Sequence, residues 1–506
     1  MTAALDDPPA AGVTVGADSL AGGSSGPAAL EPMIAAALRA MAAGAHRRGG
    51  PLPTGDPATV AAGVAAALDG SPLPEHGVGA IEAVTALTGE LTAGTADPAD
   101  PRCAGHLHCP PLAVAVAAEV VAAALNPSLD SWDQGPSATA LEPWVIRALA
   151  GLVGYGPEAA GVLTSGGTES NLMGLLLARD AAVEKTSGRS AAVHGLGPAG
   201  TRLRIFCSEV AHFSVRRNAA LLGLGEESVV AVAVDGAYRM DPAALDDHLA
   251  AAVRDGLIPA AVVATAGTTD FGSIDPLPEV TALARRYGAW SHVDAAYGGG
   301  ALFSDRLAGL LDGLDRADSV ALDLHKLGWQ PVAAGVFLAG AAGALRPLAR
   351  RVAYLNPADD EAAGYPSLLG HSLRTTRRVD ALKIAVTLRA LGRRGVGRLV
   401  DACHDLARHA ADRISADGRL ELAAPPVLST VVFRYRADPA HTDTVNGDLR
   451  RRLLRDGAAV IGRTEIDGAV WLKLTLLNPH ATTADVDALL DAVRAAGDGT
   501  RAEAVA

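Results

Sequence analysis

The least frequent basic side chain of this 506-residue sequence gives the first indication of its chemistry. The chain has 43 basic residues, and its lysines are Lys185, Lys326, Lys383 and Lys473. Lys326 closes the run SVALDLHK (319–326), whose apolar residues predict a strand buried in a sheet. Removing an amine from water favours its neutral form, which is a nucleophile toward an aldehyde. Arginine cannot supply such an amine, so Lys326 is the candidate nucleophile.

Two further side chains stand near other predicted strand ends. Asp294, in HVDAAYGGG (292–300), precedes the lysine by 326 − 294 = 32 residues and follows apolar residues. A carboxylate in such a run needs a cation or a strong donor as its partner, and the protonated ring nitrogen of pyridoxal phosphate would be one. A salt-bridged or helix-capping aspartate is the alternative. His212, in SEVAHFSV (208–215), could stack on a planar cofactor or simply be a polar residue where a helix begins.

A glycine pair marks a candidate anion site. TSGGTESN (164–171) lies between an apolar strand and a helix, so Gly166 and Gly167 would let backbone N–H groups approach a phosphate. An ordinary tight turn capped by Thr168 is the alternative. GLGPAG (195–200) matches the dinucleotide pattern G-x-G-x-x-G, but it precedes a predicted strand instead of following one. We therefore interpret that segment as a loop.

Composition argues against several other kinds of site. The formal charge of 43 − 56 = −13 argues against nucleic acid or an anionic membrane as the partner. His106 and His108, in GHLHC, have Cys109 as their one nearby ligand in the sequence, so we expect no metal site. Four scattered cysteines without a CxxC pair indicate a reducing compartment, the cytoplasm. The longest apolar stretch, residues 110–125, is too short to cross a bilayer.

The candidate side chains require a scaffold that brings strand ends together. Between residues 160 and 340, short β-branched runs alternate with helical stretches, which predicts βαβ units on a mostly parallel sheet. The carboxyl ends of such strands share one edge, where ligands of open α/β folds bind. We expect a large domain over residues 101–385 and a small α+β domain over residues 386–506. Residues 1–30 have the composition of a disordered leader, and residues 31–100 that of Ala-rich helices.

The motifs together resemble those of the group II pyridoxal-phosphate-dependent amino-acid decarboxylases. TSGGTESN, SEVAHFS, HVDAAY and DLHKLGW occur in the order of that family, and the resemblance extends over residues 100–480. It implies an α/β chain of pyridoxal-phosphate fold type I, with a mostly parallel seven-stranded central sheet flanked by helices. It also implies pyridoxal 5'-phosphate as the cofactor and a homodimer joined through helices of residues 31–100, with its active site at the interface.

Matching the family motifs residue by residue assigns roles to the candidates. Lys326 resembles the lysine that bonds to the cofactor, Asp294 the partner of the ring nitrogen, and His212 the histidine that stacks on the ring. The other expected cofactor contacts are Gly167, Thr168, Thr268, Ala296, His325 and, from the partner chain, Ser372. Relatives carry a tyrosine on a mobile loop that protonates the substrate Cα after CO2 leaves. Tyr365, in EAAGYPSLLG, matches it best, and Tyr354 is the second choice.

The similarity of several short segments narrows the choice of substrate. AGHLHCPP, NPSLDSWDQGPSATALE, SLRTTRRVDALK and LKLTLLNP are similar to bacterial 2,4-diaminobutyrate decarboxylases and to siderophore-type lysine and ornithine decarboxylases. A diamino acid has a distal ammonium, which needs an acid. We assign Asp133, reaching across the dimer, to this role, and His106 to a second substrate contact. The expected activity is release of CO2 from an L-amino acid, with 2,4-diaminobutyrate favoured. Lysine or ornithine decarboxylation, an aminotransferase, an aldehyde synthase and a non-enzymatic cofactor binder are the alternatives.

Overall fold

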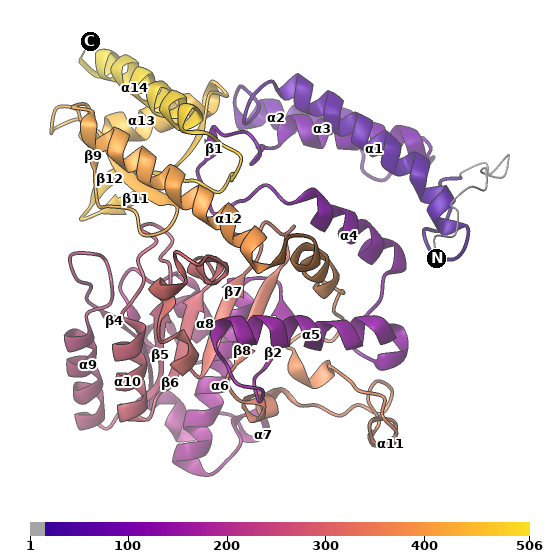
Figure 1. Ribbon diagram of the computed structural model, residues 1–506, viewed down its shortest axis with the longest axis vertical. Coiled ribbons are helices and arrows are strands. Elements are labelled where there is room, and N and C mark those ends of the chain that lie inside the picture. The colour runs from indigo at the N-terminus through magenta and orange to yellow at the C-terminus, as the bar shows by residue number, and fades with distance from the viewer. Residues whose placement is uncertain (1–15, 506) are drawn as a thin grey trace.

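A seven-stranded sheet forms the centre of the structure, a computed structural model that describes residues 16–505 (Figure 1). Its strands are β2 (Ala160–Thr164), β3 (Leu203–Ser208), β4 (Val229–Val232), β5 (Ile258–Thr265), β6 (Trp290–Ala295), β7 (Ser319–Asp323) and β8 (Gly335–Ala339). They lie in the order β2-β8-β7-β6-β5-β3-β4, and β8 alone runs antiparallel to its neighbours. This topology confirms the predicted α/β fold with a mostly parallel sheet.

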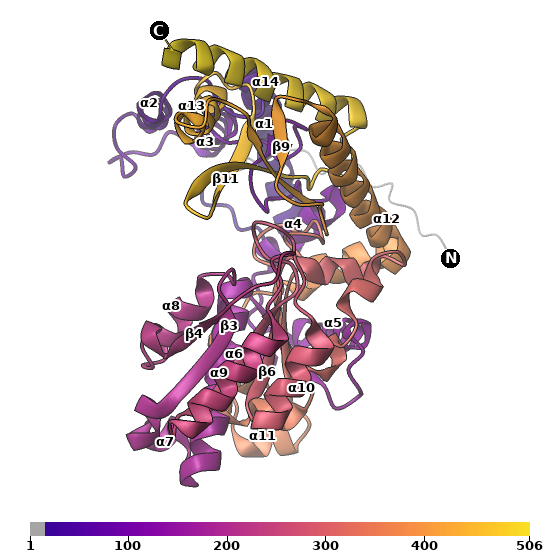
Figure 2. The ribbon, with the colours of Figure 1, turned by 90° about the vertical axis from the view of Figure 1, so that its left-hand side faces the viewer.

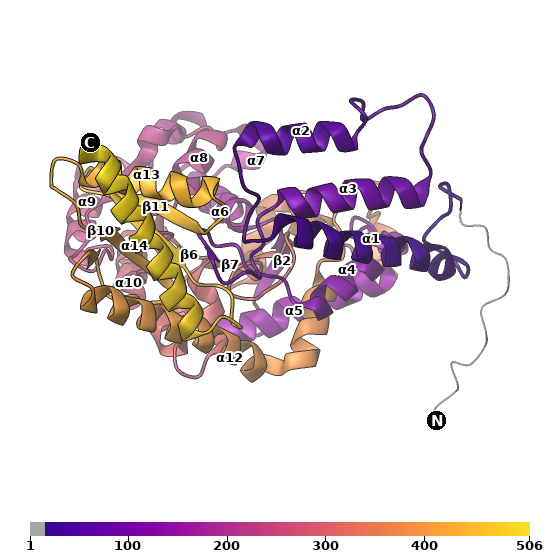
Figure 3. The same ribbon diagram turned by 90° about the horizontal axis from the view of Figure 1, so that it is seen from above.

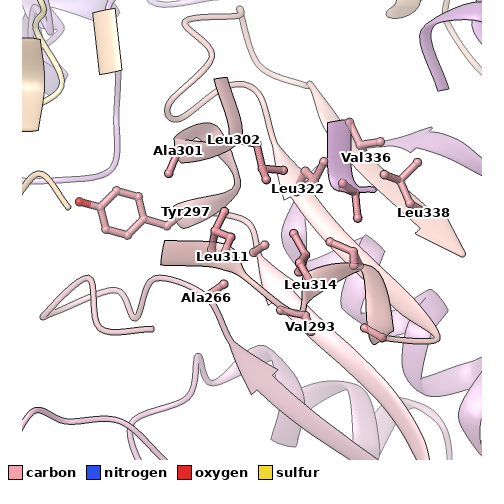
Figure 4. Packing of buried hydrophobic residues seen from close by; sticks show 14 of the residues in the cluster. Ala266, Val293, Tyr297, Ala301, Leu302, Leu311, Leu314, Leu322, Val336 and Leu338 are labelled. Carbon is pink, nitrogen blue, oxygen red and sulfur yellow. The ribbon is translucent and has the colours of Figure 1, made fainter. Parts of the chain in front are cut away.

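The central strands are buried on both faces, which explains their continuous apolar sequences. Every residue of β7 and of β8 is buried. Val293, Leu322, Val336 and Leu338 belong to one core cluster and lie close together in Figure 4. Strands of a parallel sheet that is covered on both faces contain apolar residues at successive positions, because each face packs on helices. Truncating one of these leucines to alanine would cost about 2–5 kcal/mol.

Helices cover the two faces of the large sheet. They are α5 (Pro136–Val153), α6 (Gly167–Ser187), α8 (Ser214–Leu221), α9 (Pro242–Arg254) and α10 (Leu277–Tyr287). The short α7 (Ala191–His194) contacts α6, and the short α11 (Ala358–Ala362) follows β8 along the chain. Alternate residues of β5 separate the faces, because Val262 joins the core beside α9 and α10, whereas Val263 joins the core beside α6 and α8. Asp241 caps α9, with its carboxylate accepting a hydrogen bond from the Ala243 N–H at 2.8 Å.

A second, five-stranded sheet lies above the first in the view of Figure 2. Its strands are β1 (Cys103–Ala104), β9 (Leu420–Leu422), β10 (Thr430–Tyr435), β11 (Val460–Ile466) and β12 (Ala469–Thr475), in the order β1-β11-β12-β10-β9. The helices α12 (Ala381–Ala416), α13 (Thr442–Arg455) and α14 (Thr483–Val505) pack with it. α12 crosses the expected domain boundary at residue 385, and its one non-helical residue is Gly392.

The N-terminal helices stand beside the sheets. They are α1 (Gly26–Arg48), α2 (Pro57–Ala67), α3 (Ala80–Gly94) and α4 (Ala113–Leu125), and Figure 3 shows α1, α2 and α3 lying side by side. α1 begins within the predicted leader, of which residues 1–15 lie outside the described part. Among the described helices, α1 is long and apolar enough to cross a membrane, with a mean hydropathy of 1.2. It packs along α3, where Arg47 donates a hydrogen bond to the Gly89 carbonyl at 2.8 Å.

Candidate active site

Lys326 lies on the wall of a cavity at the carboxyl edge of the large sheet. The cavity has a volume of about 320 Å³, and β5, β6 and β7 each bring a residue to it from near their ends: Thr265, Asp294 and Asp323. Its lining consists of Ser165, Gly166, Gly167, Thr168, Glu169, Asn171, His212, Thr265, Gly267, Thr269, Asp294, Ala296, Tyr297, Asp323, His325 and Lys326. The sequence predicted Lys326 at the end of a strand. β7 instead ends three residues before Lys326 (326 − 323), so the lysine lies in the following turn.

Asp294 is buried, and its carboxylate is held from two sides. Oδ2 accepts a hydrogen bond from Asn171 Nδ2 at 2.7 Å, and Oδ1 accepts one from the Ala296 N–H at 3.1 Å. Asn171 lies on the first turns of α6, and its Nδ2 also donates to Ser214 Oγ at 3.0 Å. Neither hydrogen bond to Asp294 comes from a charged group. The carboxylate therefore keeps its charge available for a cationic partner in the cavity.

His292, on β6, fixes the orientation of Asn171. Its Nε2 lies 3.0 Å from Asn171 Oδ1, which can only accept, so Nε2 carries the ring proton. Its Nδ1 then accepts a hydrogen bond from Ser319 Oγ at 2.8 Å. Burial lowers the pKa of His292 to about 4, so the ring is neutral at pH 7. The Asn171 amide is thereby locked with its NH2 group toward Asp294.

His212 borders the same cavity, two residues before α8 begins. Its Nδ1 accepts a hydrogen bond from the Ser214 N–H at 3.3 Å, so Nε2 carries the ring proton. Burial lowers the pKa of His212, and the neighbouring Asp294 opposes this shift without reversing it. A neutral imidazole on the cavity wall suits contact with the face of a planar ring.

His325 has its tautomer set by the backbone. Its Nδ1 accepts a hydrogen bond from the Ala334 N–H at 3.2 Å, which leaves the proton on Nε2. Nε2 lies 3.4 Å from Asp323 Oδ2. Burial lowers the pKa of His325, against the raising effect of Asp323. The ring therefore presents an N–H group to the carboxylate of Asp323.

The N-terminus of α6 forms a cradle for an anion. Gly166 precedes the helix with φ 153°, a conformation that favours glycine. A Cβ on Gly167 would lie 2.9 Å from the Ala296 Cβ, so only glycine lets the backbone come this close. The first N–H groups of a helix lack partners within the helix and attract phosphate. Gly167, Thr168 and Ala296, all predicted cofactor contacts, line the cavity together here.

This set of groups fits pyridoxal phosphate. Lys326 offers an amine for its aldehyde, Asp294 a carboxylate for its ring nitrogen, and His212 an imidazole for its face. The N–H groups at the start of α6, where Gly167 and Thr168 line the cavity, suit its phosphate. The predicted residues Lys326, Asp294, His212, Gly167, Thr168, Ala296 and His325 all line the one cavity.

Thr268 and His106 do not line this cavity. Thr268 Oγ1 accepts a hydrogen bond from the Ser273 N–H at 3.1 Å in the turn after β5, and its neighbour Thr269 lines the cavity instead. His106 follows β1 of the smaller sheet, and burial together with the charge of Lys473 lowers its pKa. The glycine pattern GLGPAG lies before β3, partly within a 3-10 turn, and contributes no residue to the cavity lining.

Ser372 is also outside the lining, but its segment reaches the cavity wall. Ser372 is buried, and its Oγ accepts a hydrogen bond from the Arg374 N–H at 3.1 Å. Arg374 Nε lies 2.9 Å from Glu169 Oε1, and Glu169 lines the cavity. Within one chain, the segment around Ser372 thus holds the wall and not the interior of the site.

Tyr365 and Asp133 share a second cavity, which has a volume of about 440 Å³. Trp132 and Tyr354 also line it. The Tyr365 ring meets Trp132 edge-on, with the ring centroids 5.0 Å apart. Tyr365 is 48% exposed and Tyr354 is 82% exposed. Neither tyrosine lines the cavity that holds Lys326 of the same chain.

Asn171, Asp323 and Thr269 are among the lining residues that were not singled out from the sequence. Asn171 had a detectable signal, because it lies four residues after Gly167 and so shares a helix face with the glycine. Asp323 opens the DLHK motif but looks like an ordinary polar residue after a strand.

The other lysines have structural partners. Lys383 is 1% exposed and lies 2.6 Å from Glu119 Oε1. Lys473 lies 2.7 Å from Asp270 Oδ1, and Lys185 donates a hydrogen bond to the Gly288 carbonyl at 3.2 Å. Lys326 is therefore the one lysine on the cavity wall. Within the described residues, no three His, Cys, Asp or Glu side chains gather as a metal site would require.

Comparisons with known proteins agree with this chemistry. Residues 87–436 match the family profile described as the pyridoxal-dependent decarboxylase conserved domain. The L-2,4-diaminobutyrate decarboxylase of Rhizobium meliloti (strain 1021) is 43% identical over 427 residues, which cover 84% of this chain and 83% of that relative. The L-2,4-diaminobutyrate decarboxylase of Acinetobacter baumannii is 41% identical over 405 residues, which cover 78% of this chain and 79% of that relative.

A solved structure extends the likeness to the fold. It is the crystal structure of the glutamate decarboxylase domain of diaminobutyrate-pyruvate transaminase and L-2,4-diaminobutyrate decarboxylase from Vibrio parahaemolyticus. It superposes with a TM-score of 0.86 at 35% identity, covering 95% of this chain and 98% of that one. The chain therefore belongs to the pyridoxal-dependent decarboxylase family and is a pyridoxal-phosphate-dependent carboxy-lyase.

Proposed function

We propose that the cavity of Lys326 is the site of decarboxylation, with Lys326, Asp294 and His212 as its central residues. The placement of these three side chains around one cavity supports this assignment. When bound, pyridoxal phosphate supplies an aldehyde and a sink for the electrons that CO2 leaves on the substrate. Lys326 provides the amine that bonds to the aldehyde. Asp294 holds a proton on the ring nitrogen, with its two oxygens kept in place by Asn171 and the Ala296 N–H.

The neighbouring residues orient the cofactor and exclude water. His212 presents its neutral ring to the cofactor face, and Gly167 and Thr168 hold the phosphate through the N-terminus of α6. We assign Thr268, His325, Ala296 and, from the partner chain, Ser372 to the surrounding contacts. Tyr365, carried to the site by the partner chain, returns a proton to the substrate Cα. A tyrosine at this point favours the amine as product over the aldehyde that an aldehyde synthase would form.

The proposed substrate is L-2,4-diaminobutyrate. The single observation that carries this choice is the 43% and 41% identity to L-2,4-diaminobutyrate decarboxylases over most of the chain. Asp133 supports it as an acid for the distal ammonium, because it shares a cavity with Tyr365. Its Oδ1 accepts a hydrogen bond from Ser131 Oγ at 2.5 Å, which fixes the carboxylate. His106 is the second proposed substrate contact.

The working form that we propose is a cytoplasmic homodimer. An apolar groove of about 560 Å³ between α1 and α4 supports the dimer, and its apolar lining includes Leu30, Ile34, Leu38, Val121 and Leu125. Exposed apolar patches of this kind mark interaction surfaces. We keep residues 31–100 as the dimerisation segment, residues 101–385 as the large domain and residues 386–506 as the small domain. The four cysteines are free thiols, as a reducing compartment requires.

The substrate assignment is tested at Asp133. Replacing Asp133 by asparagine removes the charge that pairs with the distal ammonium, so KM for diaminobutyrate should rise about tenfold or more. Asp360→Asn is the matched control, because Asp360 lines the same cavity and has no assigned role. Steady-state kinetics should show less than a twofold change for the control. An unchanged KM in Asp133→Asn would contradict the assignment.

A further inference from the structure

Asp323 is a buried carboxylate beside the reactive lysine. It ends β7, its side chain is 2% exposed, and it lines the cavity. Its Oδ2 lies 3.1 Å from Lys326 Nζ. Its Oδ1 has no hydrogen-bond partner among the described residues. A buried carboxylate is costly unless it is paired, so the presence of Asp323 calls for a reason.

The backbone around Asp323 fixes the position of its carboxylate. A Cβ on Gly167 would lie 3.2 Å from Asp323 Oδ2, and a Cβ on Gly166 would lie 3.8 Å from Oδ1. The carboxylate is thus packed against the start of α6. On its other side, His325 Nε2 lies 3.4 Å from Oδ2 as a neutral N–H donor. Neither neighbour brings a full positive charge.

The other acids of the cavity have partners of their own. Glu169 pairs with Arg374 at 2.9 Å, and Asp294 is held by Asn171. The cation for Asp323 is therefore Lys326 itself. Nζ is an ammonium only while the lysine is free, because bonding to the cofactor removes two of its protons. The stabilisation that Asp323 gives is thus specific to the free lysine.

We propose that Asp323 receives the amine of Lys326 whenever an incoming amine displaces it from the cofactor, a role that rests on the function proposed above for Lys326. In the exchange, the incoming nitrogen bonds to the cofactor carbon and the bond from Nζ to that carbon breaks. The electrons of the broken bond stay on Nζ, which takes two protons from the incoming ammonium, and the total charge is unchanged. The lysine leaves as an ammonium, and the carboxylate of Asp323 stabilises it. Asp323 is then a positioning residue that favours displacement.

The exchange can be measured without turnover. Methylamine carries no carboxyl group, so it displaces Lys326 from the loaded enzyme and goes no further. After each addition, borohydride reduction traps the cofactor that is still bonded to lysine, and peptide mass spectrometry quantifies it at Lys326. Asp323→Asn should need about tenfold more methylamine for half-displacement. Asp323→Ser should behave in the same way and serves if the first variant folds poorly.

The outcomes separate this proposal from the one on which it rests. Asp246→Asn is the control, because it makes the same charge change at an exposed ion pair with Arg286. Half-displacement within twofold of wild type in both Asp323 variants would overturn the role of Asp323, with Lys326 still trapped in wild type. Trapping of the cofactor at another lysine in wild type would overturn the function proposed for Lys326.

Discussion

In the proposed mechanism, Asp294 is the residue that lets the cofactor accept the substrate's electrons. Both its oxygens are held by neutral donors, Asn171 and the Ala296 N–H, so its charge faces the cavity uncompensated. Neither contact is with a cation, so a salt-bridged aspartate does not describe them. A carboxylate held in this way can keep a proton on the cofactor ring throughout the reaction.

Replacing Asp294 by asparagine should lower kcat by roughly a hundredfold or more, because the neutral amide does not favour a protonated ring nitrogen. Product formation at saturating substrate and cofactor measures the effect. The cofactor should still bond to Lys326, which borohydride trapping can check. A kcat within a few-fold of wild type would contradict the role of Asp294.

Most of the single site residues could be predicted from their residue types. Lys326, Asp294 and His212 stand out because each is chemically conspicuous beside an apolar run. Asp323 does not, because a polar residue at the end of a strand is common. Asn171 does not, because its partners Asp294 and His292 lie far along the chain. Asn171 meets His292 across 121 positions, and no local pattern encodes that pairing.

At the scale of elements, the site depends on how α6, β6 and β7 meet. Asn171 of α6, His292 of β6 and Ser319 of β7 form one hydrogen-bonded chain. The ring of His292 also fills the space that a Cβ on Gly174 would need, 2.6 Å from its Nδ1. The neutral histidine thus joins three elements that contribute residues to the cavity of Lys326.

The pKa of His292 makes this junction sensitive to acid. Its folded value of about 4 lies below the ordinary 6.5, so between these values the unfolded chain binds a proton that the folded chain does not. The free energy of unfolding therefore falls as the pH drops through this window, by roughly 3 kcal/mol from this group. Urea unfolding at a series of pH values should show a correspondingly smaller loss for His292→Gln. Equal losses in wild type and variant would contradict the assignment.

The sequence predicts helices and strands well where the spacing of apolar residues and the length of the segment indicate the same kind of element. The βαβ pattern of residues 160–340 corresponds to strands β2 to β8, because each buried strand is an apolar run bounded by turns. β1 could not be foreseen, since it has two residues and pairs Cys103 with Val460 far along the chain. α12 continues past residue 385, because this one helix contributes buried residues to the core of each sheet.

For the whole molecule, the main feature is that the predicted site residues lie in two separate cavities. Lys326 lines one cavity, whereas Tyr365 and Asp133 line the other. A homodimer built on the apolar groove of α1 and α4 would let one chain supply what the other lacks. The resemblance to the family predicts this assembly, and the sequence pattern alone does not, because it carries no information about which surfaces meet.

Mixing two inactive variants tests the sharing of residues. Lys326→Ala lacks the amine and Tyr365→Phe lacks the proton donor, so each alone should make little amine product. After dissociation and reassociation of equal amounts, half of the dimers are mixed and each has one complete site. About a quarter of the wild-type activity should return. No recovery, with mixed dimers demonstrated by mass, would place both residues in the same chain's site.

Product analysis with carboxyl-labelled L-2,4-diaminobutyrate tests the central claim most directly. The purified chain with pyridoxal phosphate should release labelled CO2 and an equal amount of 1,3-diaminopropane, and Lys326→Ala should release neither. Ornithine, lysine, glutamate and aromatic amino acids, supplied in parallel, should be poorer substrates. Release of ammonia with an aldehyde, formation of a keto acid, or equal product from Lys326→Ala would contradict it.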